Sequence, residues 1–270
     1  MSELGNSFID VNARNFDDRA GVTDQRANEI SRNILSHLPK QNHISILDIG
    51  AGTGEIGAYL CGQDRTYTCL EESKDMIAAF AKRASTLGLE HCTFLQGDAN
   101  TTWPFPDQSK DVVFGSRVFH LLDPVHVVHE TLRVLTPTIG TFVMGKVKRD
   151  KQSPKDRFRT KMRELLIEYG AQPRPSEKRR AGILDQLEKA GMHTLATQTI
   201  YSWETTHRPI DSISNWAQKD TMGGILPPQA VKEKVLTSLR QWALDVYGDL
   251  DKDVPTQEHY ILEMATFDKQ

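Results

Sequence analysis

The chain has 270 residues, of which 38 % are hydrophobic and 26 % are charged, and its formal net charge at pH 7 is −3. This composition is ordinary for a soluble globular protein, and so small a charge gives no overall attraction to nucleic acid or to anionic membranes. The first residues lack the basic and apolar regions of a signal peptide, and no apolar stretch approaches the length of a membrane span.

Three cysteines, Cys61, Cys69 and Cys92, form no CxxC pair and have no histidine at a metal-ligand spacing. An odd number in this arrangement predicts reduced cysteines that pack in the interior, and it gives no indication of a metal site. We therefore expect a cytoplasmic protein without a bound metal.

Strands and helices are predicted to alternate through the first half of the chain. Apolar residues recur at helical spacing between Asp24 and Pro39. Short apolar strands follow at 43–50, 66–73, 92–98, 111–116 and 140–147, with helical patterns between most of them, the first near 55–61. This alternation predicts a parallel sheet with helices on both faces.

The alternation stops after residue 147, where the chain becomes more charged. Helices are predicted at 153–170, at 176–191 and from 227 onward, strands at 195–205 and 259–267, and an aromatic and polar segment at 201–224. Segment 146–180 is basic, but its charges share a helix with an apolar stripe, which favours a solvated helix face over a nucleic-acid site.

We found no linker and no internal repeat, so the sequence predicts a single domain over residues 1–270. Its predicted parts are an N-terminal cap with the first helix (1–43), a cofactor-binding core (44–147), a substrate-side region (148–258) and a last strand (259–270).

The stretch LDIGAGTGEIG, residues 47–57, places four glycines directly after an apolar strand. Glycine permits positive φ and lets a ligand approach the backbone closely. A strand that turns tightly into a helix also points free N–H groups into the crevice where open α/β sheets bind nucleotides. Glu71 and Glu72 end the next strand, where an acid can accept hydrogen bonds from ribose hydroxyls. The loop therefore predicts a nucleotide site.

The kind of nucleotide depends on the residues around the loop. The segment GTGEIG matches G-x-G-x-x-G, which keeps an NAD(P) site open, whereas the absence of G-K-[ST] excludes a Walker loop. Asp48, just before the loop, favours a ligand with positive charge. S-adenosylmethionine carries an ammonium and a sulfonium, which a loop lined only by N–H groups would repel.

The segments ILDIGAGTGEIG, TCLEESKDMI, FLQGDAN and DVVFGSRVFHLL, in this order, resemble the class I S-adenosylmethionine-dependent methyltransferases. They are most similar to the small-molecule branch that includes the ubiquinone and menaquinone biosynthesis enzymes. The resemblance covers residues 44–146. It implies a Rossmann-like, doubly wound sheet of seven strands, mostly parallel with an antiparallel last strand and with helices on both faces.

The resemblance also implies S-adenosyl-L-methionine as cofactor and assigns residues to its parts. The residues implied to line the methionine and ribose part are Asp48, Gly50, Ala51, Gly52 and Gly54. Those implied to hold the adenosine part are Glu71, Met76, Asp98 and Ala99. Ser116 and Arg117 would lie near the reacting methyl group, and Arg19 would pair with the cofactor carboxylate.

The predicted function is transfer of a methyl group to O, N or C of a small-molecule metabolite by in-line displacement. His120 is the candidate base, with a surface or capping histidine as the alternative. Candidate substrate residues are Phe119, Tyr201, Trp203 and His207. Two other functions stay open: a protein that binds the cofactor without methyl transfer, as a regulator or a cyclase, and an NAD(P)-dependent enzyme. We expect a monomer or homodimer that binds neither nucleic acid nor membrane.

Overall fold

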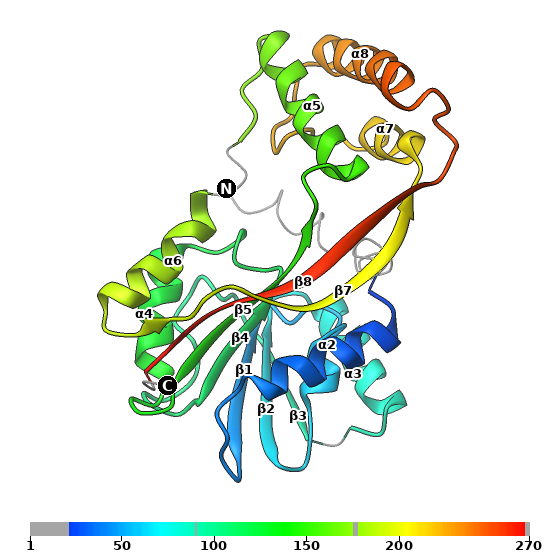
Figure 1. Ribbon diagram of the computed structural model, residues 1–270. Coiled ribbons are helices and arrows are strands. Elements are labelled where there is room, and N and C mark those ends of the chain that lie inside the picture. The colour runs from blue at the N-terminus through cyan, green and yellow to red at the C-terminus, as the bar shows by residue number, and fades with distance from the viewer. Residues whose placement is uncertain (1–21, 90, 175–177, 268–270) are drawn as a thin grey trace. The chain divides into compact units, whose positions relative to one another are not determined.

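The computed structural model describes residues 22–89, 91–174 and 178–267 (Figure 1). Arg19 and the other residues up to 21 of the predicted N-terminal part (1–43) lie outside the described residues. The chain separates into two compact units, Met1–Val147 with Glu177–Tyr201 and Tyr260–Gln270, and Lys148–Ser176 with Ser202–His259. The division falls within three strands, β5, β7 and β8. The organisation as one domain stays a prediction.

The strands form one mixed sheet. Its members are β1 (Ile44–Ile49), β2 (Arg65–Glu71), β3 (Cys92–Gln96), β4 (Val112–Ser116), β5 (Thr141–Arg149), β6 (His193–Thr194), β7 (Gln198–His207) and β8 (Val254–Thr266). The order is β3-β2-β1-β4-β5-β8-β6, and β7 also pairs with β8. Strands β1 to β5 pair in parallel, whereas β6 and β8 are antiparallel.

This topology confirms the predicted doubly wound sheet with an antiparallel last strand. Within the described residues the sheet has eight strands instead of seven. The additional β6 has only two residues, too few for a periodic pattern. The last strand also begins at Val254, five residues before the predicted boundary at 259.

Helices cover both faces of the parallel strands, as predicted (Figure 1). On one face lie α2 (Asp24–Ser36) and α3 (Lys74–Thr86), and on the other lie α4 (Pro124–Val134) and α6 (Lys178–Lys189). Thr23, Ser73 and Asp123 cap the N-termini of α2, α3 and α4 by accepting hydrogen bonds from backbone N–H groups. The helix predicted after the glycine loop is only a short 3₁₀ turn, η3 (Gly57–Leu60).

The second unit has a hydrophobic core of its own. Its helices are α5 (Pro154–Glu168), α7 (Pro209–Ala217) and α8 (Gln229–Tyr247). Phe158 of α5 is fully buried, with ring centroids 5.2 Å from Trp242 and 5.8 Å from Tyr247. The apolar stripe predicted on 153–170 therefore packs against α8. Helix α7 lies inside the aromatic segment 201–224 and was not predicted.

Two of the three cysteines form a disulfide, so the prediction of reduced cysteines is wrong for Cys61 and Cys92. Cys61 follows η3 and Cys92 begins β3, and their Cα atoms lie 6.2 Å apart. The sequence did not indicate this pair because only the tertiary fold brings the end of η3 beside β3. Cys69 is free and buried in β2, and burial raises the pKa of its thiol to about 12.

Candidate functional site

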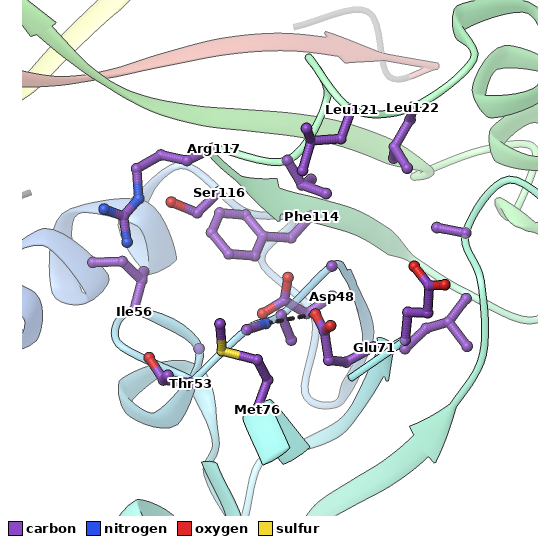
Figure 2. Close-up of a pocket in the computed structure, with 18 of the residues that line it drawn as sticks. Asp48, Thr53, Ile56, Glu71, Met76, Phe114, Ser116, Arg117, Leu121 and Leu122 are labelled. Atoms are coloured by element: carbon purple, nitrogen blue, oxygen red, sulfur yellow. Dashed lines mark hydrogen bonds between the residues drawn. The ribbon is translucent and has the colours of Figure 1, made fainter. Parts of the chain in front are cut away.

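A pocket of about 530 Å³ lies in the first unit, where β1, β2 and β4 end (Figure 2). The carboxyl ends of parallel strands are the usual ligand site of open α/β sheets, and this volume is typical of small-molecule sites. Most of the predicted cofactor and catalytic residues line it. They are Asp48, Gly50, Ala51, Gly52, Glu71, Met76, Asp98, Ala99, Ser116, Arg117 and His120.

The glycine loop has a backbone that other residues would adopt only with strain. Gly50, Gly52 and Gly54 have φ values of 61°, 58° and 70°. A Cβ atom at Gly50 would lie 2.2 Å from Val118, which is another pocket residue. A Cβ at Gly54 would lie 2.3 Å from the Phe80 ring, and Gly54 does not line the pocket. The structure therefore gives Gly54 a packing role against α3.

Glu71, at the end of β2, holds the glycine loop in place. Its Oε2 accepts a hydrogen bond of 2.9 Å from the Gly52 N–H, drawn in Figure 2, and its Oε1 accepts one of 3.0 Å from the Ser73 N–H. The carboxylate is 9 % exposed and lines the pocket. An ionised carboxylate has about four acceptor sites, so Glu71 can hold the loop and still accept from a ligand hydroxyl.

Asp48 is a buried acid beneath the loop. It is 2 % exposed, and its Oδ2 accepts a hydrogen bond from the Tyr67 hydroxyl. Its Oδ1 is also buried and has no hydrogen-bond partner among the described residues. Burial raises the pKa of Asp48 to about 8, and the charge of Glu71 adds to this rise, so Asp48 is mostly protonated at pH 7. A buried carboxyl oxygen that lines a pocket is well placed for a cationic ligand.

Tyr67 was not predicted as part of the site. It lies on β2, and a Cβ at Gly57 would come within 2.1 Å of its hydroxyl oxygen, so Gly57 leaves room for this group. Strand alternation explains its position, because the side chains of Tyr67 on β2 and Asp48 on β1 point to the same face of the sheet.

At the end of β4, Ser116 and Arg117 line the pocket next to Phe114 (Figure 2). The Arg117 guanidinium forms an ion pair with Glu55, an acid of the glycine loop that is 5 % exposed. Arg117 has φ of 62°, a conformation that is uncommon for residues other than glycine and that clusters at functional sites. Ser116 Oγ lies 2.7 Å from the Tyr260 hydroxyl oxygen of β8.

Met76, Asp98 and Ala99, which are predicted to hold the adenosine part of the cofactor, also line the pocket. Met76 and Ala99 are 5 % and 6 % exposed. The Ala99 carbonyl accepts a hydrogen bond of 3.0 Å from the Trp103 indole N–H. Asp98 Oδ1 accepts one of 2.8 Å from the Asn100 N–H, which fixes the acid at the edge of the pocket.

The four predicted substrate residues do not line this pocket. Phe119 is 1 % exposed and packs in the core, 5.1 Å from the ring of Phe142. Trp203 and His207 belong to the second unit and are buried there. A hydrogen bond of 2.8 Å joins His207 Nε2 and Ser212 Oγ, and burial lowers the pKa of His207 to about 4. Tyr201 is on β7 in the first unit.

The charge of the pocket suits a cationic ligand. Five acids line it, Asp48, Glu55, Glu71, Glu72 and Asp98, and Arg117 is the one Lys or Arg among the described lining residues. The residues present thus fit the two cationic groups of S-adenosylmethionine better than they fit the phosphates of a dinucleotide. No group of three or more metal-ligating side chains occurs within the described residues.

Comparison with known proteins shows which class of protein this chain resembles. Residues 46–138 match the model of a family described as a methyltransferase domain. The uncharacterized methyltransferase YcgJ of Bacillus subtilis (strain 168) is 27 % identical over 159 residues. That match spans 58 % of this chain and 59 % of the relative's own length.

Solved structures share the fold. A putative methyltransferase from Bacillus halodurans C-125 aligns with a TM-score of 0.57 at 15 % identity, over 88 % of this chain and 99 % of its own. A geranyl diphosphate C-methyltransferase from Streptomyces coelicolor A3(2), in complex with Mg²⁺, geranyl diphosphate and S-adenosyl-L-homocysteine, aligns with a TM-score of 0.50 at 12 % identity. That alignment covers 90 % of this chain and 79 % of the other.

The motif match and the fold together confirm the predicted class. Residues 46–138 of this chain resemble a methyltransferase domain, and the described sheet has the fold of solved methyltransferases.

Proposed function

We propose that this protein transfers a methyl group from S-adenosylmethionine to O, N or C of a small-molecule metabolite. The observation that carries the proposal is the acidic pocket at the ends of β1, β2 and β4, in which Asp48 is buried with one oxygen unpartnered among the described residues. Such a site attracts a cation and would destabilise a phosphate.

The bound cofactor supplies a methyl group that is already activated on a sulfonium. The chain therefore has to bind, orient and exclude water rather than create a leaving group. We expect Glu71 and Asp98 to accept hydrogen bonds from the ribose and the adenine amino group, and Met76 to pack on the base. All three residues line the pocket. Asp48 balances positive charge at the methionine end, and it gives up its proton there as the cation binds.

His120 is the proposed base for an acceptor that must lose a proton. It is exposed and lines the pocket, so an acceptor can reach it from solvent. A phenol, a carboxylic acid or a protonated amine needs such a base, whereas a nucleophile without a proton does not. H120N would therefore lower the rate for the first group of acceptors and leave the second unchanged.

The test combines binding with turnover. Calorimetry should show micromolar binding of S-adenosylmethionine and S-adenosylhomocysteine and no binding of NAD at the same concentrations. Incubation with metabolite fractions and methyl-labelled cofactor should then release S-adenosylhomocysteine together with a labelled small product. NAD binding alone would overturn the proposed cofactor. Cofactor binding without label transfer to any fraction would favour the regulator or cyclase function.

The partners follow from the same proposal. We propose a small-molecule acceptor, a monomer or homodimer, a cytoplasmic location and no binding of nucleic acid. Within the described residues no helix combines the length and apolar character needed to cross a membrane. The Cys61–Cys92 disulfide is unusual for a reducing compartment, so localisation of the tagged protein is the direct measurement.

A further inference from the structure

Beneath the pocket, a buried tyrosine contacts one of the pocket residues. Tyr260 of β8 is 0 % exposed, and its hydroxyl oxygen lies 2.7 Å from Ser116 Oγ at the end of β4. Between them runs β5, where Gly145 pairs with Ser116. A Cβ at Gly145 would lie 2.1 Å from the Tyr260 hydroxyl oxygen, so this glycine leaves the space that the tyrosine occupies.

The direction of this hydrogen bond follows from the surroundings of the tyrosine. Ser116 is the one hydrogen-bond partner that Tyr260 has among the described residues, and the tyrosine side chain is fully buried. If Ser116 donated, the Tyr260 O–H would be buried without an acceptor, which native proteins avoid. Burial also raises the pKa of Tyr260, so the phenol keeps its proton. Tyr260 therefore donates, and Ser116 accepts.

This direction determines what Ser116 can do in the pocket. Because the Ser116 oxygen already accepts a hydrogen bond from the Tyr260 hydroxyl, the O–H of Ser116 is directed away from Tyr260. Ser116 lines the pocket, so this hydrogen is available to a ligand bound there. Arg117 follows directly and also lines the pocket, with its guanidinium paired to Glu55 (Figure 2). A hydroxyl donor beside a guanidinium is a suitable pair for an anionic oxygen, in a pocket whose other charged groups are acids.

We propose that Ser116 donates a hydrogen bond to a ligand carboxylate and that Tyr260 is the positioning residue that fixes this donor. The proposal rests on the proposed function, because it needs the pocket to hold an amino-acid cofactor and an acceptor. Two sources could bring the carboxylate: the methionine part of the cofactor, or the methyl acceptor. The two sources require the same donor chemistry, and binding experiments distinguish them.

The direction of the bond is tested first, without any ligand. S116A leaves the buried Tyr260 donor without an acceptor and should lower the Tm by about 5 °C. Y260F keeps the ring against Gly145, leaves Ser116 facing the pocket, and should change the Tm by less than about 2 °C. The double variant S116A/Y260F should regain the Tm of Y260F. An S116A Tm equal to that of the wild type would overturn the assigned direction.

Calorimetry then tests the carboxylate, with S-adenosylhomocysteine and its analogue that lacks the carboxylate as probes. If the cofactor is the source, S116A should weaken the binding of S-adenosylhomocysteine about tenfold and leave the binding of the analogue unchanged. Y260F should weaken the binding of S-adenosylhomocysteine less than S116A does. S116T, which keeps a hydroxyl, should bind like the wild type. Equal weakening of both probes would overturn the proposal, because the loss would not depend on the carboxylate.

If S-adenosylhomocysteine binds all variants equally, the second source is tested with ¹³C-labelled acetate. Ligand-observed NMR should show acetate binding to the wild type saturated with S-adenosylhomocysteine, and weaker binding to S116A. No difference between these two proteins, or no acetate binding at all, would overturn the proposal. A wild type that binds no S-adenosylhomocysteine would instead contradict the proposed function, and the Tm measurements would still decide the direction of the bond.

Discussion

At the scale of single residues, the site depends on acids whose properties their neighbours change. Asp48 is an ordinary carboxyl by type, yet burial raises its pKa to about 8, and the Tyr67 hydroxyl only partly opposes that rise. Glu71 is less buried and spends two hydrogen bonds on the backbone of the loop and of Ser73. A carboxyl group therefore holds a loop at one position and is available to a cation at the other.

The burial of Asp48 predicts how stability depends on pH. Its native pKa of about 8 exceeds the unfolded value of 3.8, so between these values the native state holds a proton that the unfolded state has lost. The free energy of unfolding therefore falls as pH rises from about 4 to 8, by on the order of a few kcal/mol. D48N removes this group, and its Tm should change less than the wild-type Tm between pH 5 and 8.5.

The matched control is D75N, which changes an exposed acid in the first turn of α3. Its Tm should follow the wild-type dependence on pH. Thermal unfolding followed by circular dichroism at several pH values measures all three proteins. The same pH dependence for D48N and wild type would contradict a proton held by Asp48.

Neighbouring acids at the end of β2 should differ in their effect on the cofactor. E71A removes a buried acceptor that also anchors Gly52, and it should weaken S-adenosylmethionine binding by about 1–3 kcal/mol. Glu72 also lines the pocket, but it is exposed and has no hydrogen bond to the loop among the described residues, so E72A should weaken binding much less. Calorimetry compares the two variants directly. Equal losses would mean that both side chains contact the ligand.

The sequence predicted those site residues that lie within short motifs at strand ends. It did not predict Tyr67, Glu55 or Tyr260, because each acts on a residue of another segment. Tyr67 reaches Asp48 only through the register of β1 and β2, and Tyr260 reaches Ser116 across β5. Contacts of this kind are properties of the tertiary fold, and no local pattern encodes them.

At the scale of elements, the disulfide joins the segment after the glycine loop to an edge strand. Cys61 follows η3, and Cys92 is the first residue of β3, the terminal strand of the sheet order. From local patterns the sequence predicted a helix where the 3₁₀ turn η3 lies and a strand at β3, but it placed the two cysteines in no relation to each other. A separation of 31 residues is compatible with many geometries, and only the parallel pairing of β2 with β3 selects one.

This bond predicts a thiol count and a stability change. Denatured without reductant, the protein should titrate one thiol, Cys69, and after reduction it should titrate three. Closing a loop of this length stabilises the native state by about 3–4 kcal/mol in the chain-entropy account, so reduction should lower the urea midpoint. C69S should keep the dependence on reductant. Three thiols before reduction would contradict the bond.

At the scale of the whole molecule, the two compact units have separate cores and shared strands. The first unit contains every described residue that lines the pocket, and the second has its own core around Phe158. The sequence showed a change of character after residue 147 but no linker. It could not show the division, because the second unit is built from two segments distant in sequence.

The shared strands predict that the chain unfolds in one step. Strands β5, β7 and β8 each begin in one unit and end in the other, so loss of the sheet in the first unit removes strand pairing from the second. Calorimetric unfolding should therefore show one transition. We expect S-adenosylhomocysteine to contact the first unit only, and its binding should raise the midpoint temperature of this single transition.

A variant in the second unit completes this test. F158A empties a fully buried position between Trp242 and Tyr247 and should destabilise the protein by about 3–5 kcal/mol. If the units unfold together, F158A lowers the same transition that the ligand raises, and the two shifts oppose each other. Two separate transitions, one moved only by the ligand and the other only by F158A, would contradict the single domain and indicate two that unfold independently.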